Sequence, residues 1–245
     1  MATVDVVVPV YNEERSLPKS IPILRDFLSE PGFPYEWRIV VADNASIDDT
    51  SAVGKGIASD NPGRVEYVRI ERKGRGFALK QTWLASPMDI VSYMDVDLST
   101  GLEAFPALIG AIADGGHDVA VGSRLAAEAR IRRSIKRRVL TRGYNTLIKA
   151  LFFTHFGDAQ CGFKAVSRRA AQHIIPLIED NNWFFDTELL VLAEKMGYRL
   201  KDVPVVWVED TDTRVKIAAT VWEDLRGLIR LRTQRPWLRA DGEAT

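Results

Sequence analysis

The sequence has a single cysteine, three histidines, no excess of either charge and no long hydrophobic run. One cysteine, Cys161, excludes an internal disulfide framework and is typical of proteins in a reducing compartment. The histidines, His117, His155 and His173, lack the spacing of metal ligands. No stretch reaches the roughly 18 apolar residues of a membrane-spanning helix, so we expect none.

The zero net charge conceals acidic and basic blocks. The chain has 33 Lys and Arg against 33 Asp and Glu, a balance that argues against a general nucleic-acid-binding protein. Residues 1–123 carry a net charge of −7, residues 124–149 one of +8, residues 150–213 one of −4 and residues 214–245 one of +3. A hydrophobic content of 46% argues against a disordered chain and predicts a buried core.

Short β-rich runs alternate with helical patterns through the first half of the chain. We expect strands over residues 4–9, 37–42, 65–70, 90–94 and 118–121, and helices over residues 16–28, 49–59, 77–85 and 102–113. Continuously apolar strands such as VDVVVPV are typical of a parallel sheet that is covered on both faces. The alternation predicts an α/β fold with a Rossmann-like, mostly parallel sheet flanked by helices. Ligands bind such sheets beyond the carboxyl ends of the strands.

Two aspartates follow the strand expected at residues 90–94. Asp95 and Asp97 are two residues apart, so in an extended segment they point to the same side. Their carboxylates repel each other unless a cation lies nearby. Mg²⁺ and Mn²⁺ prefer one or two carboxylates together with phosphate oxygens. Aspartate is also common in solvated turns, but the position of this pair after a buried strand favours a metal site.

Asp43 ends the second expected strand. Its carboxylate can accept the ring N–H that uracil and guanine both present, so it could bind either base without distinguishing them. An N-cap or an Asx turn is the structural alternative. Ser46 or Asp48 is better placed to cap the following helix, so we favour nucleoside binding for Asp43.

The segment Lys73-Gly74-Arg75-Gly76 precedes a helical run, and glycines at a helix N-terminus favour phosphate binding. A plain surface turn explains the segment equally well. It is not a G-x-G-x-x-G fingerprint because Leu79 stands at the third glycine position, which argues against a dehydrogenase.

Three carboxylates are candidate general bases, Asp158, Asp186 and Glu188. An enzyme that transfers a group to a hydroxyl needs such a base to remove the hydroxyl proton. A phosphate acceptor does not, because its second pKa is about 6 and its oxygen is already an anion at neutral pH. The structural alternatives are a turn for Asp158 and favourable charge at a helix N-terminus for the other two.

Two segments are basic and amphipathic. In residues 124–156, apolar residues recur near helical spacing with arginine and lysine between them, and residues 214–239 repeat the pattern with Trp222 and Trp237. Both patterns are typical of helices that lie on an anionic membrane surface. A solvated helix packed on the core is the alternative for the first segment, and an oligomer interface is an equal alternative for the second. Nucleic-acid binding is disfavoured because no aromatic residues interleave with the basic residues of the first segment.

Together these elements resemble the family 2 glycosyltransferases of the GT-A fold. The resemblance rests on VVVPVYNEE (6–14), DNASIDDT (43–50), KGRGFALK (73–80), MDVDLST (94–100) and GSR (122–124). The downstream strings DAQCGFKAVSR (158–168), WFFDTELLVLA (183–193) and VPVVWVED (203–210) are most similar to dolichyl-phosphate glucosyltransferases, and next to polyprenyl-phosphate mannose synthases. The resemblance covers residues 4–232.

The resemblance implies inverting transfer of one hexose, glucose or mannose, from UDP-glucose or GDP-mannose to a polyprenyl or dolichyl phosphate, with Mg²⁺ or Mn²⁺ as cofactor. It implies donor contacts at Pro9, Tyr11, Glu13, Asp43, Lys73, Asp95, Val96 and Asp97. Asp95 and Asp97 would hold the metal, with Asp97 the more direct ligand. Phosphate contacts would come from Arg124, Arg138, Gln160, Arg214 and Lys216. With Asp97 and Arg124, Asp158 completes the expected catalytic set.

The chain departs from the family pattern at two positions. Asn44-Ala45 stands where the family usually has Asp-Gly, and Ser99 stands where mannose synthases commonly have Gln, which favours the glucosyl branch. We expect a catalytic domain over residues 1–213 and a basic C-terminal helix and tail over residues 214–245.

We expect the protein to be peripheral at the cytoplasmic face of a membrane, with no nucleic-acid partner. A homo-oligomer or a membrane-anchored partner remains open. Two other functions are also open, a glycosyltransferase with a hydroxyl acceptor and a carboxylate base, and a non-catalytic binding module.

Overall fold

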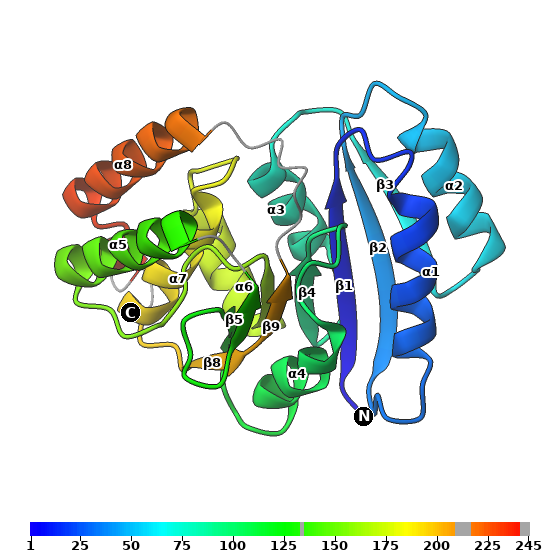
Figure 1. The fold of residues 1–245 in the computed structure, drawn as a ribbon, viewed down its shortest axis with the longest axis horizontal. Helices are drawn as coiled ribbons and strands as arrows, with labels where there is room; N and C mark the ends of the chain where they lie inside the picture. The colour runs from blue at the N-terminus through cyan, green and yellow to red at the C-terminus, as the bar shows by residue number, and fades with distance from the viewer. Residues whose placement is uncertain (133–134, 209–216, 241–245) are drawn as a thin grey trace.

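The computed structural model describes residues 1–132, 135–208 and 217–240 (Figure 1). The strands are β1 (Thr3–Val10), β2 (Glu36–Asn44), β3 (Val65–Ile70), β4 (Ile90–Met94), β5 (Val119–Ser123), β6 (Arg130–Arg132), β7 (Phe163–Ser167), β8 (Leu200–Pro204) and β9 (Val206–Val208). The α-helices are α1 (Leu17–Leu28), α2 (Thr50–Asp60), α3 (Arg75–Ala85), α4 (Phe105–Ala113), α5 (Ile135–Phe152), α6 (Arg168–Ile174), α7 (Phe185–Lys195), α8 (Ile217–Gln234) and α9 (Trp237–Ala240).

A seven-stranded sheet organises the molecule, in the order β3-β2-β1-β4-β7-β5-β8. Strand β7 runs antiparallel to both of its neighbours, and the other pairings are parallel. The predicted α/β fold with a mostly parallel sheet is therefore confirmed. The antiparallel β7 was not predicted, because Lys164 interrupts the apolar pattern of FKAVS.

All the strands and helices expected in the first half of the chain are present. Some ends differ: β2 continues to Asn44 and so includes Asp43, and α3 begins at Arg75. In the basic segment 124–156 the helix occupies only Ile135–Phe152, because Arg130–Arg132 form β6 instead. Strand β6 pairs with β9, which comes from far along the chain, and local helical spacing cannot reveal such a partner.

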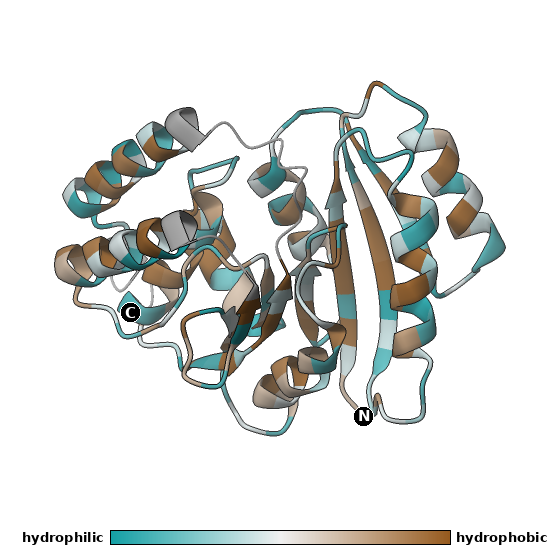
Figure 2. Cartoon of the chain, in the orientation of Figure 1, coloured by the Kyte–Doolittle hydropathy of each residue, from teal (hydrophilic) through white to brown (hydrophobic). Residues whose placement is uncertain are grey.

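The core forms because the central strands are apolar on both faces. Four valines of β1, Val4, Val6, Val7 and Val8, are at most 1% exposed. In Figure 2, β1 and β2 are hydrophobic along most of their length, whereas α1 alternates between hydrophobic and hydrophilic residues. Helix α1 buries Leu17, Ile21, Leu24 and Leu28, which share one face at helical spacing. Helices α1 and α2 lie on one side of β1 and β2, and α3 lies on the other (Figure 1).

A buried ion pair joins β1 to β2. The carboxylate of Asp5, 1% exposed, accepts hydrogen bonds from Arg38 Nε and Nη2 at 2.9 and 2.8 Å and from the Ser86 hydroxyl at 2.6 Å. Removing a carboxylate from water at this depth is unfavourable unless its partners replace the lost hydration. Within the ranges described, no helix is both long enough and apolar enough to cross a membrane.

We predict that Arg38→Met lowers the free energy of unfolding by about 3 kcal/mol, because it leaves Asp5 as a buried charge without its cation. Arg64→Met is the matched control. Arg64 and its partner Glu36 are about half exposed, 49% and 60%, and Arg64 also stacks on Trp37. The control should cost at most about 1 kcal/mol. Urea unfolding measures the free energy of unfolding of both variants. Equal losses would show that the Asp5–Arg38 pair stabilises the fold no more than the exposed Glu36–Arg64 pair does.

Candidate functional site

The loops that follow β1 and β2 are joined to each other at the carboxyl edge of the sheet. The amide of Asn12 donates to the Ser46 hydroxyl at 2.9 Å, and the amide of Ile47 donates to Asn12 Oδ1 at 2.9 Å. The Glu13 amide donates to the Thr50 hydroxyl at 2.7 Å. These bonds hold two of the predicted nucleoside-binding segments in one rigid rim.

Three non-glycine residues in the strand-end loops have left-handed backbones. The φ angles are 57° at Asn12 after β1, 59° at Ala45 after β2 and 50° at Leu98 after β4. This conformation costs an L-residue about 1–2 kcal/mol, and its concentration in three adjoining loops is typical of a functional site. Ala45 stands where the family usually has glycine. Its backbone has a left-handed conformation, which glycine adopts more readily than alanine does.

Asp43 is fully buried at the end of β2. Its carboxylate accepts hydrogen bonds from the Ser46 amide at 2.9 Å, the Tyr67 hydroxyl at 2.5 Å and Arg69 Nη1 at 2.8 Å. Burial alone would raise the pKa of Asp43, but the bonds from Ser46, Tyr67 and Arg69 outweigh it and hold that pKa below its usual value. Asp43 therefore organises this loop, and its contact with a nucleoside stays a prediction.

Two predicted donor-binding residues meet at the rim. Lys73 is exposed, and its Nζ lies 3.7 Å from the centroid of the Tyr11 ring. Glu13 Oε2 accepts a hydrogen bond from the Ser16 hydroxyl at 2.6 Å, close to the start of α1. Pro9 and Val96 are half-buried. The structure thus brings Tyr11 and Lys73 together.

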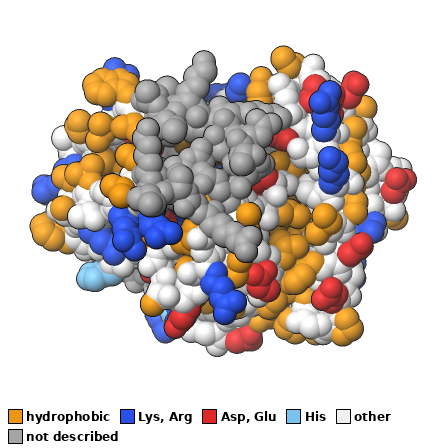
Figure 3. Space-filling model, viewed as in Figure 1, with side chains coloured by type: hydrophobic (Ala, Val, Ile, Leu, Met, Phe, Trp, Pro, Cys, Tyr) orange, Lys and Arg blue, Asp and Glu red, His pale blue; other side chains and the backbone are white. Residues whose placement is uncertain are grey.

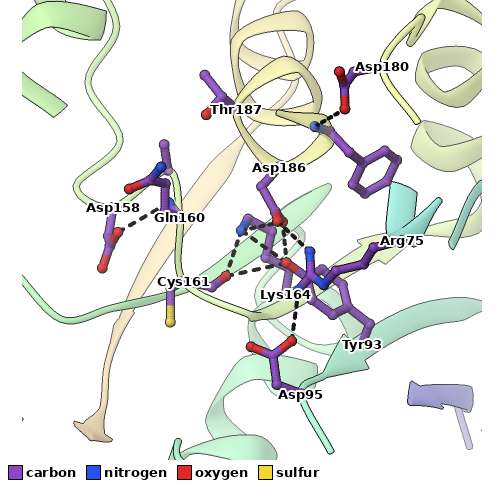
Figure 4. A network of polar contacts seen from close by, with 12 residues as sticks. Arg75, Tyr93, Asp95, Asp158, Gln160, Cys161, Lys164, Asp180, Asp186 and Thr187 are labelled. Carbon is purple, nitrogen blue, oxygen red and sulfur yellow. Dashed lines mark hydrogen bonds and ion pairs between the residues drawn. The ribbon is translucent and has the colours of Figure 1, made fainter. Parts of the chain in front are cut away.

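Arg75 binds both Asp95 and Asp186. Its Nη2 donates to Asp95 Oδ1 at 2.8 Å and its Nη1 to Asp186 Oδ2 at 2.8 Å (Figure 4). Its guanidinium carbon lies 4.8 Å from the centroid of the Tyr93 ring and 4.9 Å from that of Trp183. Two aromatic rings and two carboxylates leave this arginine little freedom, so Asp95 has a set position.

Lys164 completes this network. It is fully buried, and its Nζ donates to Asp186 Oδ1 at 2.7 Å and to the Cys161 carbonyl at 2.6 Å, while the Tyr93 hydroxyl donates to Asp186. Burial would raise the pKa of Asp186, but Lys164 and Arg75 outweigh it and keep that pKa below its usual value. Sequence reasoning missed Lys164, although a lysine within an otherwise apolar strand is a detectable signal.

The absence of a side chain at Gly162 leaves room for the Asp95 carboxylate. A Cβ atom at Gly162 would lie 1.9 Å from Asp95 Oδ2. Gly74 and Gly76 likewise press against the segment before α7, where a Cβ atom would lie 2.6 Å from the Asn181 carbonyl oxygen and 2.7 Å from Phe185 Cβ.

The first turn of α3 already has protein partners. The Gly74 amide donates to Asn44 Oδ1 at 2.6 Å, and the Phe77 amide donates to the Asn181 carbonyl at 3.0 Å. The glycines of this segment therefore permit close packing, and phosphate binding by the segment stays a prediction.

Arg124 and Asp158 form a second buried ion pair. Arg124 Nε and Nη2 donate to the two carboxylate oxygens at 2.7 and 3.0 Å, and the Arg124 amide donates to Oδ2 at 3.2 Å. Asp158 is fully buried and Arg124 is 8% exposed. Burial would raise the pKa of Asp158, but the charge of Arg124 and its hydrogen bonds hold that pKa below its usual value.

Glu188 is also fully buried, and its Oε2 accepts a hydrogen bond from Arg230 Nη2 at 2.8 Å.

The remaining predicted residues lie in different places. Arg138 is exposed on α5. Gln160 donates its backbone amide to Asp158 Oδ1 at 3.2 Å and its side-chain amide to Asp224 Oδ2 at 3.0 Å. Arg214 and Lys216 lie outside the described residues.

The metal ligands expected from the sequence fit a partly protein-bound divalent ion. Asp97 is exposed, its Oδ1 accepts the Ser99 amide at 2.9 Å, and Asp95 is 41% exposed. Across the described ranges, no three His, Cys, Asp or Glu side chains gather into a metal cage. Two carboxylates without a third ligand suit Mg²⁺ or Mn²⁺ that takes its other ligands from a diphosphate and water.

Comparison with known proteins connects this arrangement to one family. The family model described as "Glycosyl transferase family 2" matches residues 5–175. The chain is 34% identical over 222 residues to the protein named glycosyltransferase AglD of Haloferax volcanii, covering 89% of this chain but 35% of that protein. It is 29% identical to the dolichyl-phosphate beta-glucosyltransferase ALG5A of Trichomonas vaginalis, covering 88% of this chain and 69% of that one.

A solved structure shares the fold. Glucosyl-3-phosphoglycerate synthase from Mycobacterium tuberculosis, in complex with Mn²⁺, UDP-glucose and phosphoglyceric acid, superposes with a TM-score of 0.69 at 19% identity. The match covers 94% of this chain and 79% of that one. The expected GT-A-like architecture is thereby confirmed.

We predict that Gly162→Ala lowers the turnover of the catalysed reaction at least about 100-fold, because the new methyl group displaces the Asp95 carboxylate, and misplacement by about 1 Å has this effect. The control is Gly143→Ala on the exposed side of α5, where a Cβ atom would meet nothing within 4 Å. The control should retain turnover and gain up to about 1 kcal/mol of stability. Steady-state kinetics and thermal unfolding distinguish the two variants, and full activity in Gly162→Ala would contradict the steric argument.

Proposed function

Because this chain belongs to glycosyl transferase family 2, we propose that it transfers one hexose, glucose or mannose, from UDP-glucose or GDP-mannose to a polyprenyl phosphate at a membrane surface. The named relatives support the lipid acceptor, since one of them is a dolichyl-phosphate beta-glucosyltransferase. The chain spans about a third of AglD, so the activity of that whole protein is not carried over directly.

The observation that carries the choice of acceptor is the state of the three candidate bases. Asp158, Asp186 and Glu188 are each buried and each bound by an arginine or a lysine. In Asp158 and Asp186 the adjacent cations hold the pKa below its usual value, which makes each a poor proton acceptor near neutral pH. A phosphate acceptor needs no base because it is already an anion, so these buried pairs favour it over a hydroxyl.

We assign the residues as follows. Asp97 and Asp95 would hold a Mg²⁺ or Mn²⁺ ion, which when bound neutralises charge on the departing diphosphate. Arg124 would stabilise a phosphate near the reaction centre. Asp158, expected from the sequence as a catalytic residue, would act as a positioning residue that orients Arg124. Tyr11 and Lys73 would contact the nucleotide at the rim.

The membrane surface in this proposal consists of α5 and α8. These helices lie side by side at the end of the molecule away from α1 and α2 (Figure 1). Trp222 is 57% exposed, Ile229 65% and Phe153 75%. The same two helices carry exposed basic residues, Arg138 and Arg142 on α5 and Arg226 and Arg232 on α8. Hydrophobic and basic side chains lie next to one another at this end of the surface (Figure 3), as an anionic lipid surface requires.

We predict that the protein transfers radiolabelled hexose into an organic-extractable lipid phosphate. Wild type, Asp97→Asn and Asp158→Asn are incubated with UDP-glucose or GDP-mannose, Mn²⁺ and either polyprenyl phosphate or the matching polyprenol. Asp97→Asn should lose at least about 100-fold in rate because one ligand to the ion is lost. Asp158→Asn should be slower without a change in the acidic limb of the pH profile, since the residue transfers no proton.

Transfer to polyprenol but not to its phosphate would replace this proposal by the hydroxyl-acceptor alternative. Metal-dependent binding of a nucleotide sugar without any product would indicate a non-catalytic module.

We predict that the double variant Trp222→Glu/Ile229→Glu loses most of its binding to vesicles that contain anionic lipid, because two apolar contacts become charges. Each buried apolar side chain contributes on the order of 1.5–3 kcal/mol, so a loss of at least about tenfold is expected. Ile23→Glu is the control, since Ile23 is 56% exposed on α1 at the other end of the molecule. Vesicle sedimentation measures binding, and equal binding of all three proteins would remove α8 from the membrane contact.

A further inference from the structure

A buried carboxylate on α8 has one oxygen without a partner. Asp224 is 3% exposed, and its Oδ2 accepts the Gln160 side-chain amide at 3.0 Å. Its Oδ1 is buried and makes no hydrogen bond within the part of the chain that the structure describes. An unpaired polar atom at such depth is unfavourable, so Asp224 is a candidate for a role beyond stability.

The partner of Asp224 belongs to the loop that shapes the reaction centre. Gln160 lies in residues 157–162, between Asp158 and Gly162 (Figure 4). Asp158 orients Arg124 through two side-chain hydrogen bonds, and Gly162 lies directly against the carboxylate of Asp95. A shift of this loop therefore moves both Arg124 and Asp95.

Helix α8 packs on the core through residues on the same side as Asp224. We call the helix seated when these contacts are formed. Gly227 lies against the Phe184 ring, where a Cβ atom would come within 2.4 Å, and Arg230 bonds Glu188 at 2.8 Å. Leu228 and Leu231 are buried. The helix exposes Trp222 and its neighbours on the other side, so one rigid element touches both the outer surface and the catalytic loop.

We propose that Asp224 is a positioning residue, which links the seating of α8 to the catalytic loop 157–162 through its hydrogen bond with Gln160. A seated α8 holds Gln160 and thereby holds the loop in the arrangement that Arg124 and Asp95 require. An unseated α8 releases Gln160 and loosens the loop. The consequence for turnover rests on the proposed function, whereas the consequence for the loop does not.

The charges around Asp224 make this link depend on pH. Burial first, and then the negative charges of Asp180, Glu223 and Asp186, outweigh the opposing effect of the Gln160 hydrogen bond and raise the pKa of Asp224 to about 7. These acids come from the segment before α7, from α8 and from α7, and Tyr144 of α5 also faces Asp224. The neutral form fits the buried site, so its stabilisation is present at low pH and is lost as the pH rises through about 7.

The test is hydrogen–deuterium exchange of the full chain, read on peptides that cover residues 157–162 and corrected for intrinsic exchange. In wild type, the loop should exchange about fivefold faster at about pH 8.5 than at about pH 6, because ionised Asp224 seats less well. Asp224→Asn imitates the neutral acid and should stay slow at both pH values. Asp224→Ala removes the acceptor and should be fast at both.

Glu223→Gln is the matched control, because Glu223 is the exposed neighbour of Asp224 on the same helix. It should retain the pH response of wild type, apart from a small shift of the midpoint. In lipid-phosphate transfer, we expect the turnover of wild type to fall above pH 7. Asp224→Asn should not show this fall.

Loop exchange that is equal in wild type, Asp224→Asn and Asp224→Ala at both pH values would overturn the link. If the exchange pattern holds but no variant transfers hexose to a lipid phosphate, the link stands and the proposed function fails.

Discussion

Two buried cations, Arg75 and Lys164, decide where the carboxylates of the site lie. They meet at Asp186, and Arg75 also holds Asp95. Two positive and two negative charges balance in this network, which keeps the buried carboxylate of Asp186 ionised. Without this balance, burial would neutralise Asp186 and leave Asp95 free to turn. The position of the first aspartate of the D-x-D pair thus depends on residues that lie 20 and 69 positions away from it in the sequence.

Two further buried carboxylates of the candidate site are also paired with arginines. Arg124 is oriented by the fully buried Asp158, and Glu188 is paired with Arg230 of α8. Each of these acids serves to place a cation, which suits a reaction whose charges lie on phosphates. An enzyme with a neutral hydroxyl acceptor would instead need one carboxylate with a raised pKa and an open path to the acceptor. Asp224 has a raised pKa, but it is 3% exposed and faces Gln160.

Glycine allows these charged groups to approach one another. A side chain at Gly162 would occupy the place of the Asp95 carboxylate, and one at Gly74 would meet the Asn181 carbonyl. The left-handed turns at Asn12, Ala45 and Leu98 have a related effect, because they aim three strand-end loops at a common rim. The site is therefore built from close backbone contacts as much as from its reactive side chains.

Local pattern was enough to predict the alternating strands and helices of the first half. It also led to the predictions that the site lies at the carboxyl edge of the sheet and that Asp95 and Asp97 hold a metal together. Such features depend on neighbours within a few residues, which periodicity and spacing reveal. The position of Lys164 in an apolar strand was detectable, but its partners, the antiparallel course of β7 and the Asp224–Gln160 contact could not be predicted in this way. Each acquires its role from partners that are distant in the chain, and a buried charge has meaning only once the fold shows which opposite charge faces it.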